Sequence, residues 1–184
     1  YLVARLCTSA WAALVVGIAP VHHSWETEPG FRTVFNIAYP HNSRLADLLL
    51  GAWYRWDTGW YMTVATQGYG AAPQAVVFAP LYPILVRYLG RILGDEYLLA
   101  GLILSNVAYI GSLYLLYRMV ITRFPAEVAK RSLVWLALFP TAFYFLAAYT
   151  ESLFLLLVLV TISAAQARRF MIAGSGLFLV TLTR

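Results

Sequence analysis

The composition of this chain is that of a membrane protein. Of its 184 residues, 61% are hydrophobic and 11% are charged, and the formal net charge is +5. A soluble domain carries about 25% charged and about 45–50% apolar residues, so a soluble globular protein is excluded. The 6 Trp, 13 Tyr and 10 Phe and the mean hydropathy of +0.71 also exclude a disordered chain, which leaves a protein with several membrane spans.

Five apolar runs are predicted to be membrane-spanning helices. They cover residues 6–21, 98–117, 132–148, 152–167 and 170–184. The fifth run is short for a bilayer, so we expect the chain to be the N-terminal part of a protein that continues beyond Arg184. A cleavable signal peptide is the alternative for the first run, although no clear cleavage site precedes Val21.

The distribution of basic residues predicts the orientation of these spans. The stretch 118–131 contains four basic residues and one acid, and Arg168 and Arg169 follow the fourth run with no acid nearby. By the positive-inside rule both loops are cytoplasmic. The long segment 22–97 and the turn 149–151 are then on the outer side of the membrane.

Two helices in the outer segment are predicted to lie in the membrane interface. Residues 45–56 carry one apolar stripe opposite charged side chains, and residues 80–93 keep apolar residues at helical spacing beside Arg87 and Arg91. Tryptophans in this part of the chain suit the headgroup level. A short true span is the alternative for the second helix. Both helices flank Asp57.

Two carboxylates map to the outer membrane boundary, Asp57 and Glu151. Aromatic residues in 55–61 surround Asp57; they could hold a sugar ring or an isoprenoid and reduce hydration of the carboxylate, which makes it a better base. The alternative is that Asp57 caps a helix from Thr58 to Gln67 that ends at Gly68. A helix dipole favours Glu151 in a first turn, but a carboxylate near hydrocarbon also needs a partner, water or a function.

Other polar residues give weaker indications. Arg184 ends the fifth run on the outer side, where its guanidinium could bind a phosphate or act as a snorkelling anchor. The three histidines lie in the outer segment without ligand spacing and Cys7 has no partner, so we expect no metal site and no disulfide. Pro140 interrupts the third run, and a kink there could open a cavity.

Four motifs follow one another along the chain. They are Arg55-Trp56-Asp57-Thr58-Gly59-Trp60-Tyr61, Phe78-Ala79-Pro80-Leu81-Tyr82-Pro83, Leu104-Ser105-Asn106, and Leu138-Phe139-Pro140-Thr141-Ala142-Phe143 leading into Ala148-Tyr149-Thr150-Glu151-Ser152-Leu153-Phe154. As an ordered set they resemble the PIG-V family of mannosyltransferases, which have the GT-C architecture. The Arg-rich, Lys-poor style is similar to that of bacterial members, and Ala79 departs from the Phe that many members have.

The resemblance implies an all-α polytopic membrane protein with a GT-C-like helical bundle and interfacial helices in the first outer loop. It implies transfer of mannose, with inversion, from a polyprenyl-phosphate donor to a glycan or glycolipid acceptor. Asp57 matches the catalytic acid of the family, and Glu151 matches the second acid often found in the next outer loop. We expect Arg184 to stabilise the departing phosphate.

The other expectations concern ligands and location. We expect Arg55, Trp56, Trp60 and Tyr61 to bind substrate together with Arg184, and we expect no cofactor, metal or nucleic-acid partner. We expect the protein in the plasma membrane of a bacterium, in contact with its lipids, with the active site on the outer side. The main alternative is a transporter that uses Asp57 and Glu151 for substrate or ion coupling, and a non-catalytic scaffold or lipid-binding protein is the third class.

Overall fold

The computed structural model describes residues 1–18, 50, 53–54, 56–71 and 73–184, and every regular element in them is helical. The α-helices are α1 (Leu2–Ile18), α4 (Asp57–Gln67), α5 (Leu81–Ile92), α6 (Tyr97–Ile121), α7 (Ala126–Leu138), α8 (Glu151–Gln166) and α9 (Phe170–Thr181). The short 3₁₀ helices whose bounds lie within the described residues are η4 (Tyr69–Ala71), η5 (Pro73–Val77) and η6 (Ala142–Phe145). The all-α prediction is confirmed for the described residues.

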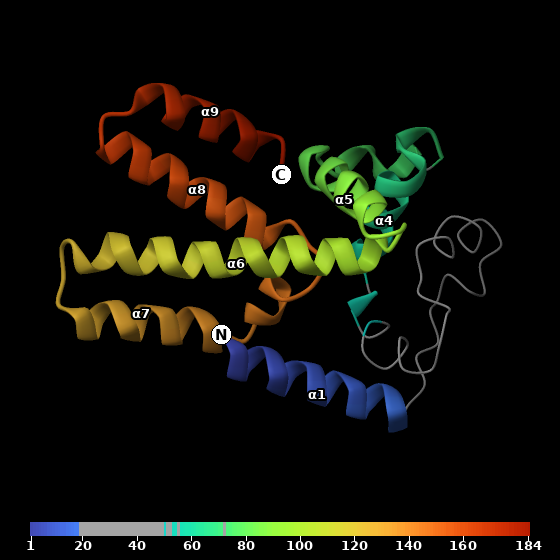
Figure 1. Ribbon diagram of the computed structural model, residues 1–184, viewed down its shortest axis with the longest axis horizontal. Coiled ribbons are helices and arrows are strands. Elements are labelled where there is room, and N and C mark those ends of the chain that lie inside the picture. Colours follow the sequence, from blue (N-terminus) through green and yellow to red (C-terminus); the bar gives the residue numbers. More distant parts are fainter. Residues whose placement is uncertain (19–49, 51–52, 55, 72) are drawn as a thin grey trace.

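Helix α6 is the element around which the others pack. Helices α5, α7 and α8 all contact it, and α9 lies against α8 (Figure 1). The 25 residues of α6 correspond to about 37 Å, which exceeds the roughly 30 Å of a bilayer's hydrocarbon core. Among the described helices, α6 is the one long and apolar enough to cross a membrane, while α8 and α9 are shorter apolar helices.

The helix bounds agree with several of the predicted spans and differ at the third. Helix α6 covers the predicted 98–117, α8 covers nearly all of 152–167, and α9 begins at Phe170 as predicted. The range 132–148 is not one continuous helix, because α7 ends at Leu138 and η6 follows. Phe139 has φ −59° and ψ 139°, the extended backbone that a following proline imposes, so Pro140 ends the helix instead of kinking it.

Helices α4 and α5 form the part of the fold that the sequence placed in the first outer loop. Helix α5 reproduces the helix predicted over 80–93, whereas the one predicted over 45–56 lies mostly outside the described residues. The guanidinium of Arg87 on α5 donates to the carbonyl oxygens of Ala65 (2.5 Å) and Val64 (3.0 Å) at the end of α4. Gly68, the residue directly after α4, has φ 81°, a conformation that glycine adopts at no steric cost.

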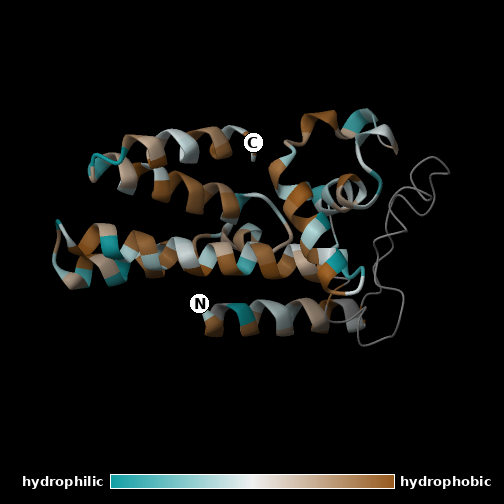
Figure 2. Cartoon of the chain, turned by 45° about the horizontal axis from the view of Figure 1, so that its top comes forward, coloured by the Kyte–Doolittle hydropathy of each residue, from teal (hydrophilic) through white to brown (hydrophobic). Residues whose placement is uncertain are grey.

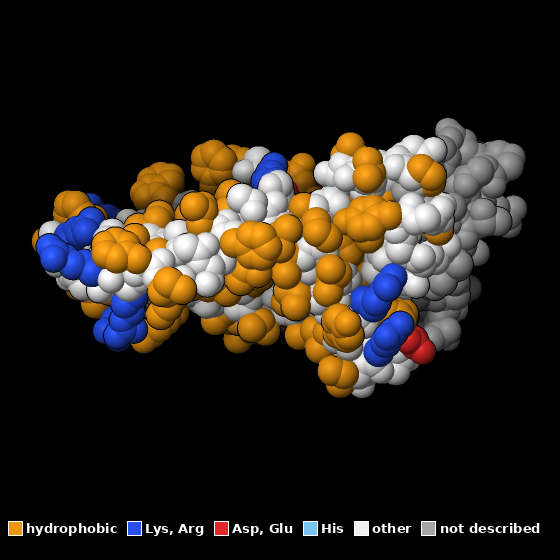
Figure 3. Space-filling model, turned by 90° about the horizontal axis from the view of Figure 1, so that it is seen from above, with side chains coloured by type: hydrophobic (Ala, Val, Ile, Leu, Met, Phe, Trp, Pro, Cys, Tyr) orange, Lys and Arg blue, Asp and Glu red, His pale blue; other side chains and the backbone are white. Residues whose placement is uncertain are grey.

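Basic and apolar side chains separate along the bundle. Hydrophobic residues run along α6 to α9 (Figure 2), and many of their side chains are on the molecular surface (Figure 3). Basic side chains gather at the end where α6 joins α7 and α8 joins α9, at the left of Figure 3. Helices α4 and α5 lie at the other end (Figure 1). Which end faces the cytoplasm stays a prediction of the positive-inside rule.

A buried hydrogen-bond chain fixes the segment that precedes α8. The hydroxyl of Tyr82 on α5, fully buried, lies 3.0 Å from the carbonyl oxygen of Gly101 and 2.8 Å from Oγ of Ser105, both on α6. Ser105 Oγ also lies 2.8 Å from the carbonyl oxygen of Tyr149. A Cβ on Gly101 would stand 3.0 Å from Cε of Met62, so the absence of a side chain there allows the close packing. The chain therefore joins α5 and α6 to the residues just before Glu151.

Replacement of Ser105 by Ala should destabilise the protein by about 1–3 kcal/mol, because it leaves the buried carbonyl of Tyr149 without its donor. Ser112→Ala is the matched control, since Ser112 is equally buried but its short hydrogen bond is within its own helix, to the carbonyl of Ala108 at 2.8 Å, and its contact with the carbonyl of Ser152 on α8 is longer, at 3.5 Å. We expect a clearly larger fall in melting temperature for Ser105→Ala than for Ser112→Ala. Equal melting temperatures would show that the Ser105 bond does not hold this segment.

Candidate active site

One polar pocket brings together residues from distant parts of the chain. Its volume is about 480 Å³, and it is lined by Trp56, Asp57, Thr141, Tyr144, Tyr149, Glu151 and Arg184. These residues come from the start of α4, the segment between α7 and α8, the start of α8 and the residues after α9. Four residues predicted from the sequence to belong to the site, Trp56, Asp57, Glu151 and Arg184, therefore line one cavity.

Asp57 is the first residue of α4, and its side chain is exposed. The residue in the N-cap position is Trp56, and no side chain caps this helix end with a hydrogen bond. The alternative in which Asp57 serves as the N-cap is therefore wrong. Asp57 therefore lies in the first turn of α4, at the positive end of the helix dipole, and lines the pocket without being used as a cap.

Trp56 has an unusual backbone for a residue with a side chain. Its φ of 45° and ψ of −120° fall in a region that favours glycine, and such conformations cost on the order of 1–3 kcal/mol. The Trp56 side chain is largely exposed, at 71%, so its burial does not offset this conformational free energy. Strain of this kind collects at functional sites, where the surrounding structure holds a residue in place for a ligand.

Glu151 opens α8 and is incompletely satisfied. Its Oε1 lies 3.8 Å from Nη1 of Arg184, with the two side chains 29% and 64% exposed. Its Oε2 is buried and has no hydrogen-bond partner among the described residues. A buried carboxylate oxygen without a donor is destabilising, because it has lost its hydrogen bonds to water and no protein group replaces them. The pocket therefore contains an acceptor that a ligand hydroxyl could satisfy.

Two tyrosine hydroxyls near the acids remain protonated at ordinary pH. Burial raises the pKa of Tyr61 to about 12, and its hydroxyl lies 3.3 Å from Oγ1 of Thr150. Burial, with a smaller contribution from the charge of Asp57, raises the pKa of Tyr149 as well. Neither phenol is suited to accept a proton, so the candidate bases among the lining residues are the carboxylates of Asp57 and Glu151.

An apolar cavity adjoins the polar pocket. It measures about 330 Å³, and its lining is Thr8, Trp11, Ala12, Trp53, Trp56, Phe143, Ala147 and Tyr149. Trp56 and Tyr149 line both spaces, so the cavity and the pocket are neighbours. The arrangement offers charged groups on one side and aromatic rings on the other, which suits an amphiphilic ligand.

The family model described as Mannosyltransferase (PIG-V) matches residues 3–182. The chain belongs to the PIG-V mannosyltransferase family. No curated protein and no solved structure matches it. Membership of this family makes the chain a membrane mannosyltransferase, and so an enzyme instead of the transporter or scaffold considered as alternatives.

Two of the predicted binding residues of this PIG-V family member, Trp60 and Tyr61, are not in the pocket lining. The indole of Trp60 stacks on Phe78, with ring centroids 6.1 Å apart and 18° between the planes. Tyr61 packs edge-on against Phe78 and is buried behind the pocket, 3.3 Å from Thr150. Arg55 lies outside the described residues. Trp60 and Tyr61 thus contact the protein interior beside the site.

Sequence reasoning missed three lining residues of the PIG-V pocket, Thr141, Tyr144 and Tyr149. The signal was available for two of them, because Thr141 and Tyr149 stand in the motifs on either side of η6. Tyr144 stacks on Tyr149 with ring centroids 5.6 Å apart. These residues reach the pocket because the chain leaves α7 at Pro140 and turns through η6 before α8 begins.

The described part of this PIG-V family member contains no cluster of three His, Cys, Asp or Glu side chains that could hold a metal ion.

Proposed function

We propose that the enzyme transfers mannose from a polyprenyl-phosphate mannose donor to a hydroxyl of a glycan or glycolipid acceptor, with inversion at the anomeric carbon. One observation carries the proposal: two carboxylates and a guanidinium line a pocket that shares Trp56 and Tyr149 with an apolar cavity. A lipid-linked sugar phosphate has a part for each feature, since it combines a sugar, a charged phosphate and a hydrocarbon chain.

Asp57 acts as the general base in this proposal. Its carboxylate accepts the proton of the acceptor hydroxyl while that oxygen forms a bond to the anomeric carbon. The bond between the anomeric carbon and the phosphate oxygen breaks on the opposite face, and its electron pair leaves with the lipid phosphate. The exposed position of Asp57 supports this role, because an incoming acceptor can reach it.

Glu151 orients a substrate hydroxyl in this proposal. The buried Oε2 of Glu151 accepts no hydrogen bond from the described residues, and a sugar ring has several hydroxyl groups that can donate to it. A site that hydrogen-bonds a substrate hydroxyl rejects analogues that lack it, because the buried acceptor is then left unpaired. This position therefore supports a role in choosing and aligning the sugar.

Arg184 stabilises the departing phosphate in this proposal. Its guanidinium is 64% exposed and contacts Glu151 at 3.8 Å, which is longer than a hydrogen bond. Such a loosely held cation can turn its donors toward phosphate oxygens, which guanidinium binds in bidentate fashion. The negative charge that develops on the leaving group is the charge that most needs stabilisation.

The apolar cavity supports an isoprenoid carrier instead of a nucleotide. Every buried CH₂ group contributes about 0.8 kcal/mol, so a cavity lined by Trp11, Trp53 and Phe143 favours a hydrocarbon chain next to the polar pocket. The basic loops lie at the other end of α6, which supports a pocket on the outer side of a bacterial plasma membrane.

A comparison of donors tests this proposal in membranes that contain the full-length enzyme. We expect transfer of labelled mannose from polyprenyl-phosphate mannose to envelope acceptors, and no transfer from GDP-mannose when synthesis of the lipid donor is blocked. Trp11→Ala should raise KM for the long-chain donor by roughly tenfold, since about 1.4 kcal/mol of chain contact corresponds to that factor. The KM for a donor with a single isoprene unit should change little.

Trp135→Ala provides the matched control for Trp11→Ala. Trp135 on α7 is 73% exposed and Trp11 is 69% exposed, but Trp135 lines neither the pocket nor the cavity. Transfer from GDP-mannose under the blocked condition would contradict the lipid donor. An equal rise of KM in both tryptophan variants, or a rise that is the same for short and long donors, would contradict the placement of the chain.

A further inference from the structure

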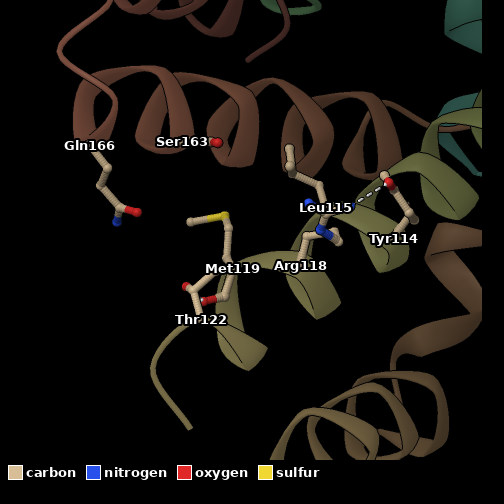
Figure 4. A pocket seen from close by; sticks show the side chains of 7 residues that line it. All are labelled: Tyr114, Leu115, Arg118, Met119, Thr122, Ser163 and Gln166. Atoms are coloured by element: carbon tan, nitrogen blue, oxygen red, sulfur yellow. Dashed lines mark hydrogen bonds between the residues drawn. The ribbon is translucent and has the colours of Figure 1, made fainter. Parts of the chain in front are cut away.

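A second polar pocket lies near the end of the bundle that carries the basic loops. It measures about 370 Å³ and lies between α6 and α8, lined by α6 residues from Tyr114 to Thr122 and by Ser163 and Gln166 of α8. Figure 4 shows Ser163 and Gln166 on α8 and Met119 and Arg118 on α6 around this space, with Arg118 turned toward Tyr114. None of its lining residues takes part in the site of Asp57 and Glu151, so the mannosyltransferase reaction does not account for it.

Arg118 gives this pocket a positive charge. Its Nη1 donates to the hydroxyl of Tyr114 at 3.2 Å, and its guanidinium carbon lies 6.0 Å from the centre of the Tyr114 ring. These two contacts hold the guanidinium at the pocket while most of its five N–H donors remain available to a ligand. No acid lines the pocket.

Two neutral hydrogen-bond donors and the nearby basic residues add to the attraction of Arg118 for an anion. The side chains of Ser163 and Gln166 form no hydrogen bond within the part of the chain that the structure describes, so both can donate to a ligand. The nearby loops add several more basic residues, and their single acid, Glu127, is already paired with Lys130 at 2.8 Å. The C-terminal ends of α6 and α8 carry partial negative charge, so the positive charge at this pocket comes from the basic side chains alone.

The pocket extends from the helix ends toward the apolar middle of the bundle. Thr122 and Gln166 stand at the ends of α6 and α8, and Tyr114 lies eight residues, or about 12 Å, further along α6. Arg118 is between these levels, and Leu115 and Met119 provide apolar contact beside it. Polar donors at a helix end with apolar surface below them match a phospholipid, whose headgroup and acyl chains are arranged in that order.

We propose that this pocket binds the phosphate of an anionic membrane phospholipid, with Arg118 as the charged contact and Ser163 and Gln166 as neutral donors. The acyl chains lie along α6 toward Tyr114. The inference is independent of the donor and mechanism proposed for the active site, because it rests on a different pocket.

Lipid retention by the purified full-length protein tests the inference. Native mass spectrometry counts bound lipids after exchange into equal mixtures of phosphatidylglycerol and phosphatidylcholine with the same acyl chains. We expect phosphatidylglycerol to be retained about five- to tenfold better, and Arg118→Gln to remove most of that preference, since one basic residue near a membrane surface contributes on that order. Arg118→Lys should retain part of it, because Lys keeps the charge and loses the bidentate geometry.

Arg123→Gln is the matched control, because Arg123 is an exposed basic residue just beyond α6 that does not line the pocket. Equal loss of preference in Arg123→Gln and Arg118→Gln would show diffuse attraction to the basic end and overturn the inference. Equal retention of the two lipids by the native protein would also overturn it. Displacement of the lipid by millimolar inorganic phosphate would show a site for free phosphate instead. If Arg118→Gln does not fold, the variant with Ser163→Ala and Gln166→Ala together must show the reduced preference.

Discussion

An Asp57→Asn enzyme is expected to transfer mannose about 10²–10⁴ times more slowly than the native enzyme, because loss of a general base removes a factor of that size. Asn has nearly the same shape as Asp, so substrate contacts that depend on shape are kept. Asp57 is exposed and caps no helix, so α4 should form as before. We therefore expect kcat to fall while KM and the melting temperature change little.

Glu127→Gln is the control for this experiment, since it also removes one exposed carboxylate from a first helical turn. Glu127 lies in the first turn of α7, at the other end of the bundle, where it pairs with Lys130. We expect this variant to retain the full rate. If Asp57→Asn transferred mannose at the native rate with normal expression, Asp57 would not be the base, and Glu151 would become the candidate to test.

The elements predicted best are those whose pattern depends on local sequence alone. The apolar run that became α6 and the amphipathic pattern that became α5 were both visible, because helical spacing of apolar side chains needs no tertiary information. The third predicted span failed at Pro140. Hydropathy continues through 139–148, yet proline restricts the backbone of Phe139 to the extended region and ends α7. Hydropathy alone does not include this local steric rule.

The candidate site was predicted in its described charged residues and, apart from Trp56, not in its aromatic ones. Acids are few in this chain, so Asp57 and Glu151 stood out, and the structure places both in one pocket. Aromatic residues are frequent, and nothing in the sequence distinguishes Tyr149, which lines the pocket, from Trp60, which stacks on Phe78. That distinction depends on which way the chain turns after α7, and therefore on tertiary packing.

The second large effect concerns Arg184, and a pair of substitutions decides between two roles for it. If Arg184 stabilises the departing phosphate, Arg184→Gln should lower kcat by about 10²–10³-fold, the usual cost of removing one donor to a developing anion. The fold should remain stable, because the contact with Glu151 is 3.8 Å long and Arg184 is 64% exposed, and exposed ion pairs contribute at most about 1 kcal/mol. The alternative is that Arg184 only holds Glu151 in position.

The two roles predict different results in a Glu151→Gln background. A cation that only positions the Glu151 carboxylate loses its purpose once that charge is removed, so Arg184→Gln would then have little further effect on kcat. If Arg184 contacts the phosphate, Arg184→Gln still lowers kcat by about 10²–10³-fold in the same background, because the ligand of Arg184 is then the substrate. We expect the second result in single-turnover transfer assays, with partial recovery in Arg184→Lys since Lys keeps the charge without the bidentate fork. Collapse of the effect in the Glu151→Gln background would assign Arg184 to positioning and leave the phosphate without a cation among the residues lining this pocket.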